Sequence, residues 1–64
     1  MKPGSVTSAD HGRKVVYRPP HVPTTEAGEE GVITGLTSHP EIVFVRYGSD
    51  VFSKATYVID LEFA

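Results

Sequence analysis

The sequence predicts an all-β domain, a single small barrel of four to five antiparallel strands. Short stretches rich in Val, Ile, Phe and Tyr recur along the chain, and turn signals with Gly, Pro, Ser or Asp separate them at intervals of about ten residues. The chain has 64 residues and no cysteine, so one small core without disulfides must hold it together. Closure of the sheet would cover its edges and its apolar face, which favours a barrel over an open sheet.

Residues 1–11 are expected to form a disordered tail, which leaves residues 12–64 as the folded domain. The tail is rich in Ser, Gly, Pro, Thr and Asp, and Val6 is its only sizeable aliphatic residue after Met1. It therefore has little apolar surface to bury against a core. The apolar stretch of a secretory signal is also missing from this region.

The first strand is predicted over residues 13–18. Val15 and Tyr17 fall on one face of this strand and Lys14, Val16 and Arg18 on the other, which is the period of a half-buried strand. Two prolines then end the strand, because proline cannot donate a hydrogen bond to a neighbouring strand. Residues 21–30 follow as a long first loop, and such loops in compact domains are often functional.

The central hairpin consists of strands at residues 31–37 and 42–47, joined by a tight turn at residues 38–41. Gly35 permits a bend or a bulge in the first of these strands. The second is apolar on both faces, as expected for a central strand of a curved sheet. Its residues alternate, with Val43, Val45 and Tyr47 on one face and Ile42, Phe44 and Arg46 on the other.

Residues 48–50 are a turn signal, and residues 51–57 are predicted as a fourth strand. A short helical turn at residues 58–61 is expected to precede a brief last strand that ends at Phe63. A long first loop, a tight central hairpin and a helical turn before the last strand favour an SH3-like barrel among small barrels. An OB-like barrel is the alternative, although it generally needs a longer chain and a helix that the sequence does not indicate.

The composition weighs against several classes of function. A net charge of −2 is unusual for a general binder of phosphate backbones, which is normally basic. No apolar segment approaches the roughly 18 residues of a membrane-spanning helix, so we expect no membrane contact. The absence of cysteine fits a cytoplasmic protein and removes thiolate metal sites.

No motif in the sequence indicates catalysis, a metal site or a cofactor. The three histidines lack the spacing of metal ligands. Ser38 and His39 are neighbours in a tight turn, which offers no pocket for a developing oxyanion. The glycines between residues 28 and 35 are not followed by the Lys-Ser/Thr pair of a phosphate loop. We therefore expect a protein that is not an enzyme and uses no cofactor.

Four short motifs resemble known proteins. They are Gly-Arg-Lys-Val-Val-Tyr-Arg-Pro-Pro-His from Gly12, Glu-Glu-Gly-Val-Ile from Glu29, Val-Phe-Val-Arg-Tyr from Val43, and the closing Asp-Leu-Glu. Their order over residues 12–63 resembles short uncharacterised proteins of bacteriophages and prophages, and more distantly the KOW and Tudor-like members of the SH3-like barrels. The resemblance implies a phage-borne accessory domain in the host cytoplasm, with no activity to transfer. An aromatic cage for methylated amines cannot be assigned from it.

The candidate binding residues are aromatic and basic side chains that alternation places on the outside of the barrel. They are Arg18, Phe44, Arg46 and Lys54, helped by His21 in the first loop. An exposed aromatic ring beside an arginine is typical of a protein contact, so a protein partner is expected, with a host or phage protein implied by the resemblance. Nucleic acid is the alternative ligand, since an aromatic ring can also stack on a base. A second alternative is that Phe44 fills a minor core under the first loop while Arg46 covers apolar surface. The oligomeric state stays open.

Overall fold

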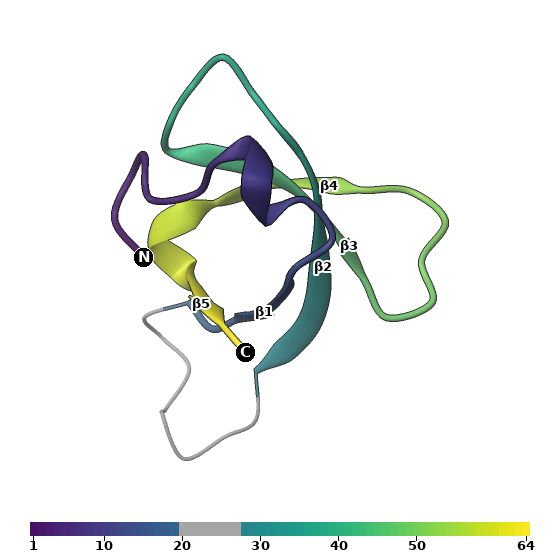
Figure 1. Cartoon of the computed structure of the whole chain (residues 1–64). Coiled ribbons are helices and arrows are strands. Elements are labelled where there is room, and N and C mark those ends of the chain that lie inside the picture. Colours follow the sequence, from purple (N-terminus) through teal and green to yellow (C-terminus); the bar gives the residue numbers. More distant parts are fainter. Residues whose placement is uncertain (20–27) are drawn as a thin grey trace.

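The computed structural model describes residues 1–19 and 28–64, and in these residues the protein is all-β. Five antiparallel strands form one sheet in the order β4-β3-β2-β1-β5 (Figure 1). The strands are β1 (Lys14–Tyr17), β2 (Glu29–Leu36), β3 (Ile42–Tyr47), β4 (Lys54–Tyr57) and β5 (Leu61–Phe63). The helical elements of the described residues are two short 3-10 turns, η1 (Ser8–Asp10) and η2 (Val58–Asp60).

The sheet curves strongly but is not closed. Its order ends at β4 on one side and at β5 on the other, and these two edge strands do not pair with each other. Figure 1 shows the strands curling around a common centre, with η2 connecting the two edges. The expected all-β class and the helical turn before the last strand are therefore confirmed, whereas the observed sheet is open.

The bounds of the strands agree with the sequence at β3 and differ at β2 and β4. The prediction that the first loop extends through residue 30 was wrong, because Glu29 and Glu30 pair with Tyr17 and Val16 of β1. The fourth strand was predicted to begin at residue 51 and instead begins at Lys54. The residues before it form the tip of the β3–β4 loop.

A bulge interrupts the pairing of β2 with β3. Ile33 lies opposite Val45 and Gly35 lies opposite Phe44, so the residue between them has no partner on β3. That extra residue is Thr34. A bulge of this kind increases the local twist and bend of a strand, and β2 is the middle strand of the sheet.

The core lies on the concave side of the sheet. Its fully buried side chains come from β1, β2, β3, η2 and β5 and are Val15, Ile33, Val43, Val45, Val58 and Leu61. Tyr47 is also buried, at 5% exposure. The alternation of buried and exposed residues along β3 is the period of a strand with one face in the core.

Residues 1–11, expected to be a disordered tail, lie against this core in the structure. Val6 is buried among the core residues, and Met1 packs on their edge. The Met1 amino group donates hydrogen bonds to the backbone carbonyls of Val58 and Leu61, at 3.0 and 2.7 Å. Figure 1 shows η1 crossing one end of the curled sheet, so this segment covers apolar surface that the open sheet leaves free.

The described residues include no helix that is long and apolar enough to cross a membrane.

Candidate binding surfaces

Phe44 and Arg46 point outward from β3, on the face opposite the core. Both are exposed, while the alternate residues Val43 and Val45 are buried. The cross-strand neighbours of Phe44 are small, since Gly35 on β2 and Ala55 on β4 lie opposite it. Neither cross-strand partner has a side chain larger than a methyl group to place against the ring, which is 39% exposed.

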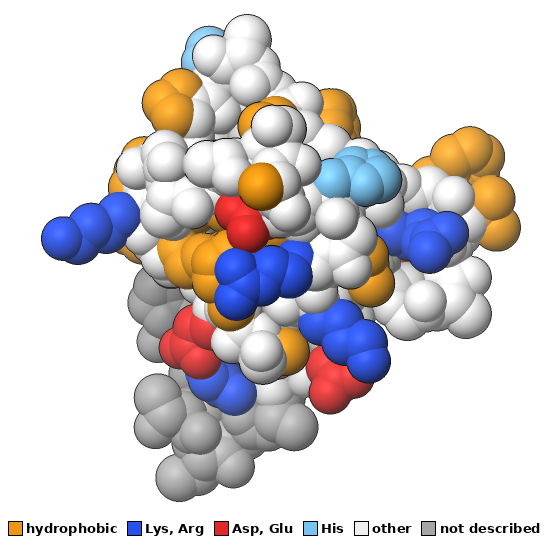
Figure 2. Space-filling model, viewed as in Figure 1, with side chains coloured by type: hydrophobic (Ala, Val, Ile, Leu, Met, Phe, Trp, Pro, Cys, Tyr) orange, Lys and Arg blue, Asp and Glu red, His pale blue; other side chains and the backbone are white. Residues whose placement is uncertain are grey.

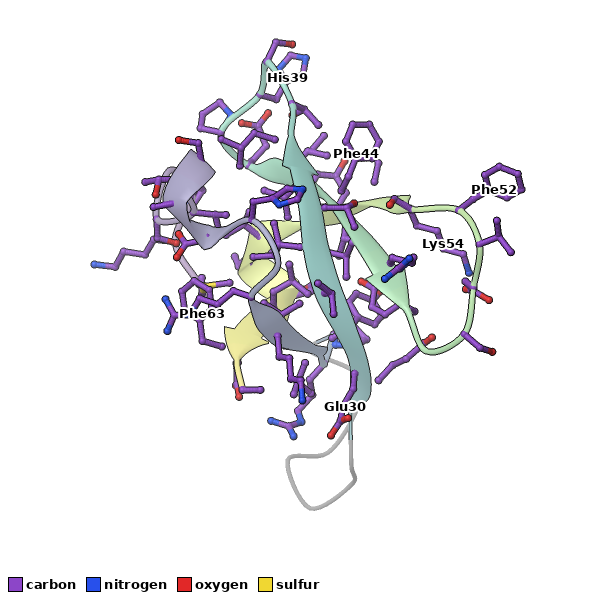
Figure 3. All side chains as sticks on the ribbon, turned by 45° about the vertical axis from the view of Figure 1, so that its right-hand side comes forward. Glu30, His39, Phe44, Phe52, Lys54 and Phe63 are labelled. Atoms are coloured by element: carbon purple, nitrogen blue, oxygen red, sulfur yellow. The ribbon has the colours of Figure 1, made fainter. Side chains whose placement is uncertain are left out.

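The tip of the β3–β4 loop carries two further apolar side chains. Val51 and Phe52 are each 82% exposed, and they are the most exposed large hydrophobic residues of the described chain. Phe52 points away from the molecule, and Phe44 lies on the same side (Figure 3). Figure 2 shows hydrophobic side chains capping this projecting loop, with a Lys or Arg side chain next to them. We call Phe44, Arg46, Val51 and Phe52 the hairpin surface.

Thr34 connects the loop tip to the sheet. Its hydroxyl donates to the carbonyl oxygen of Phe44 at 3.3 Å and lies 2.5 Å from the Ser53 hydroxyl. The unpaired bulge residue therefore holds the segment next to Phe52 against the strand that carries Phe44.

Two of the other predicted site residues lie elsewhere, and one lies outside the described residues. Arg18 follows β1, where its Nη1 is 3.1 Å from Glu62 Oε2 on β5 and its Nε is buried with no hydrogen-bond partner among the described residues. Lys54 lies opposite Val45 and so begins on the core side of the sheet, away from Phe44. His21 falls in the segment that the structure does not describe. The structure thus brings together only Phe44 and Arg46 of the predicted set, and the minor core proposed for Phe44 would involve the first loop, outside the described residues.

A row of basic and apolar side chains crosses the outer face beside Arg46. Val32 of β2 lies between Arg46 of β3 and Lys14 of β1 in the strand register. Glu30 borders the same shallow hollow and contributes a negative charge to it. This face therefore combines two cations with one carboxylate and is not uniformly basic.

Sequence reasoning missed a second site, which is a hollow of about 240 Å³ on the other side of the sheet. The residues that line it come from β1, β2, β3, β4 and η2; they are Tyr17, Glu29, Tyr47, Lys54, Ala55, Thr56, Tyr57 and Asp60. All four residues of β4 contribute, as expected for a hollow that runs along the free edge of this strand. We call it the tyrosine hollow.

The tyrosine hollow has an aromatic wall with a fixed geometry. The rings of Tyr17 and Tyr47 meet edge to face, with centroids 5.9 Å apart. The Tyr47 hydroxyl lies 2.8 Å from the buried hydroxyl of Thr56. Burial raises the pKa of Tyr47 above its ordinary value, and the nearby carboxylates of Glu29 and Asp60 raise it further, while the hydrogen bond with Thr56 opposes the shift.

The residues considered for catalysis lie on an exposed loop between β2 and β3. Ser38 and His39 are both exposed, and His39 Nδ1 lies 3.6 Å from Glu41 Oε1. Among residues 1–19 and 28–64, no three His, Cys, Asp or Glu side chains are grouped so that they could hold a metal ion.

The geometry therefore provides two candidate surfaces on different sides of the sheet. The hairpin surface is apolar and partly basic, and alternation along β3 was the signal that found half of it. The tyrosine hollow is aromatic and acidic, and it depends on the curl of the sheet, which brings β4 towards the end of β1. Comparisons of the chain with protein-family models, with curated proteins and with solved structures found no match.

Proposed function

We propose that the protein is a non-catalytic binding domain of SH3-like architecture that contacts a protein partner through the hairpin surface. The strand order β4-β3-β2-β1-β5, the strongly curved sheet and the 3-10 turn before β5 support the SH3-like type. A phage or prophage origin, which the resemblance implies, would make the partner a host protein or another phage protein.

The observation that carries the proposal is the pair of apolar side chains at the loop tip. Val51 and Phe52 expose 82% of their surface in a chain whose small core needs apolar residues. A domain of this size gains stability from each aromatic ring that it buries. Phe52 is instead displayed on a loop that a hydrogen bond between Ser53 and Thr34 holds in place.

A protein ligand fits this surface better than a nucleic acid does. A contact hot spot combines aromatic anchors with an arginine, as Phe44, Phe52 and Arg46 do. Because the loop is held against the sheet, it would lose little conformational freedom on binding, and the entropy cost of binding would be small. The partner would therefore present an apolar pocket for Phe52 and an acidic group near Arg46.

Nucleic acid remains the second candidate because Lys14 and Arg46 flank Val32 on the outer face of the sheet. Arg46 is two residues from Phe44 along β3. Cations beside an aromatic ring suit a single strand whose bases stack and whose phosphates are neutralised. The carboxylate of Glu30 in the same shallow hollow and the net charge of −2 weigh against this ligand.

The test is affinity capture from the natural host extract, followed by binding measurements with each captured partner in purified form. Phe52→Ser should abolish binding of the true partner, and Phe44→Ser should weaken it. Ile59→Ser is the matched control, since Ile59 is 70% exposed on η2, outside the hairpin surface. Circular dichroism should show all three variants folded.

Two results would decide against the proposal. The first is a partner whose affinity is unchanged by Phe52→Ser and Phe44→Ser. The second is binding of a single-stranded oligonucleotide that falls steeply as the salt concentration rises and is lost in the double variant Lys14→Ser, Arg46→Ser. That second result would establish the nucleic-acid function instead.

A further inference from the structure

The tyrosine hollow combines features that no part of the hairpin surface has. The rings of Tyr17 and Tyr47, from β1 and β3, lie at one depression with the carboxylate residues Glu29 and Asp60. The faces of aromatic rings attract cations, and carboxylates add direct charge attraction. From this chemistry we propose that the hollow binds a basic side chain, a guanidinium or ammonium group, of a protein partner.

The size of the hollow selects a side chain over a larger ligand. Sites for whole small molecules and cofactors typically have about 300–1,000 Å³, whereas this hollow has about 240 Å³. Its polar groups are also too few for a metal ion, since Glu29 and Asp60 are its only carboxylates among the described residues. An organic cation of side-chain size is the ligand that suits both the volume and the lining.

The charges around the hollow favour a cation. Glu29 and Asp60 make no ion pair with the described residues, whose ion pairs involve other carboxylates. Both residues line the same hollow as Tyr17 and Tyr47, which form its aromatic wall.

Lys54 is the one cationic residue among the described residues that line the hollow. Its Nζ lies 3.8 Å from Asp50 Oδ2, and Asp50 belongs to the β3–β4 loop and does not line the hollow. The Lys54 ammonium is thus shared with a carboxylate outside, which leaves two carboxylates facing the aromatic wall. This lysine would compete with a bound cation, so its removal should strengthen binding.

The hollow is accessible from the edge of the sheet. β4 ends the strand order, and no described strand pairs with its outer side. A partner segment that passes along this edge would place a basic side chain against the wall of Tyr17 and Tyr47, beside Asp60. This site is separate from the hairpin surface, and its test does not depend on the proposed function.

The experiment is an NMR titration of the intact chain with Nα-acetyl-arginine amide and, separately, with Nα-acetyl-lysine amide. Nα-acetyl-citrulline amide is the matched ligand, because it has nearly the shape of the arginine probe without its charge. The amide signals of Tyr17, Tyr47, Thr56 and Asp60 should shift with at least one cationic probe and stay unchanged with citrulline. If the arginine probe alone binds, the ligand is a guanidinium; if the lysine probe alone binds, it is an ammonium.

Variants then assign the binding to the hollow. Asp60→Asn and Glu29→Gln should each weaken the cationic probe about two- to fivefold, as expected for a partly exposed charge pair. Lys54→Met, which keeps an apolar stem, should strengthen it by a similar factor. Glu41→Gln is the control, because the Glu41 carboxylate lies in the β2–β3 loop beside His39 and does not line the hollow. This variant should leave binding unchanged.

Three results would overturn the proposal. They are equal shifts with the citrulline and arginine probes, shifts that map to residues outside the hollow, and an affinity that is insensitive to Asp60→Asn and Glu29→Gln in variants whose spectra show the native fold. Loss of partner binding in Phe52→Ser with intact cation binding would leave the tyrosine hollow established independently of the hairpin surface.

Discussion

The guanidinium carbon of Arg13 lies 3.7 Å from the centre of the Phe63 ring. The same guanidinium is 3.1 Å from the Asp10 carboxylate, so one side chain joins η1 to the last strand of the sheet. Two backbone hydrogen bonds accompany this contact, from Gly12 N to Ile33 O at 2.7 Å and from Ile33 N to Arg13 O at 3.0 Å. The N-terminal segment is thereby attached to β2 and β5 at once.

Val6 lies in this attached segment and is buried in the core, so it contributes to stability. Val6→Ala should lower the free energy of unfolding by about 1–2 kcal/mol, because it removes buried apolar groups and leaves a small cavity. Urea unfolding measures the change. Val51→Ala is the control with the same chemistry at an exposed position and should change stability by less than about 0.5 kcal/mol. Equal, negligible effects of both variants would instead support the disordered tail that the sequence predicted.

Asp10 should make the stability of the protein sensitive to acid. The hydrogen bond from the Thr7 backbone N–H, at 2.9 Å, lowers the pKa of Asp10 from its ordinary value of 3.8, and the Arg13 side chain lowers it further. Because the pKa of Asp10 is lower in the folded than in the unfolded state, its carboxylate stabilises the fold at any pH above the unfolded pKa. This contribution to the free energy of unfolding is lost as the pH falls through the folded pKa. The stability difference between wild type and Asp10→Asn should therefore shrink below about pH 4. Urea unfolding at several pH values measures it, and a difference that is constant with pH would contradict the assignment.

Tyr47 should have the opposite effect at alkaline pH. Burial raises the pKa of Tyr47 above 10.0 in the folded state. The contribution of Tyr47 to the free energy of unfolding is therefore complete when the pH is below the unfolded pKa, and it is lost as the pH rises through the folded pKa. Tyr47→Phe removes this dependence and also removes the hydrogen bond with Thr56, which costs about 1 kcal/mol at neutral pH. The stability advantage of wild type over the variant should thus decrease above about pH 10. Unfolding curves from pH 8 upward test this, and an advantage that grows with pH would be inconsistent with it.

Two glycines of β2 should respond differently to substitution. A Cβ at Gly31 would lie 2.6 Å from Val45 Cγ1 and 2.9 Å from Tyr47 Cδ1, whereas the nearest atom to a Cβ at Gly35 is 3.8 Å away, in the Phe44 ring. Gly31→Ala should destabilise the protein by about 1–3 kcal/mol through overpacking of the core. Gly35→Ala should change stability by less than about 0.5 kcal/mol. Thermal and urea unfolding of the pair measure the contrast, and similar effects would show that β2 does not approach β3 as closely as observed.

The elements that the sequence predicted well are those with a strong local pattern. The alternation along residues 42–47 identified β3 at both ends, and the turn before the last strand was found from Val58–Asp60. The start of β2 was missed because Glu29 and Glu30 are polar and resemble loop residues. Their place in the strand comes from their pairing with β1. Pairing partners distant in the sequence leave no trace in local composition.

The candidate sites show the same division between local and distant information. Alternation correctly placed Phe44 and Arg46 on one outer face. It could not show that Lys54 begins on the core side or that Arg18 pairs with Glu62, because both depend on how the strands are arranged. Phe52 was expected in a strand from its apolar character, and its exposure follows from the later start of β4.

The bulge at Thr34 has a consequence for the aromatic contact on β3. Because one extra residue separates Ile33 from Gly35, the residue opposite Phe44 has no side chain. In a regular pairing of the same residues, Thr34 would lie opposite Phe44 and its side chain would stand beside the ring. The extra residue therefore places a glycine beside Phe44, and the β2 side of this exposed ring has no side chain directly opposite it.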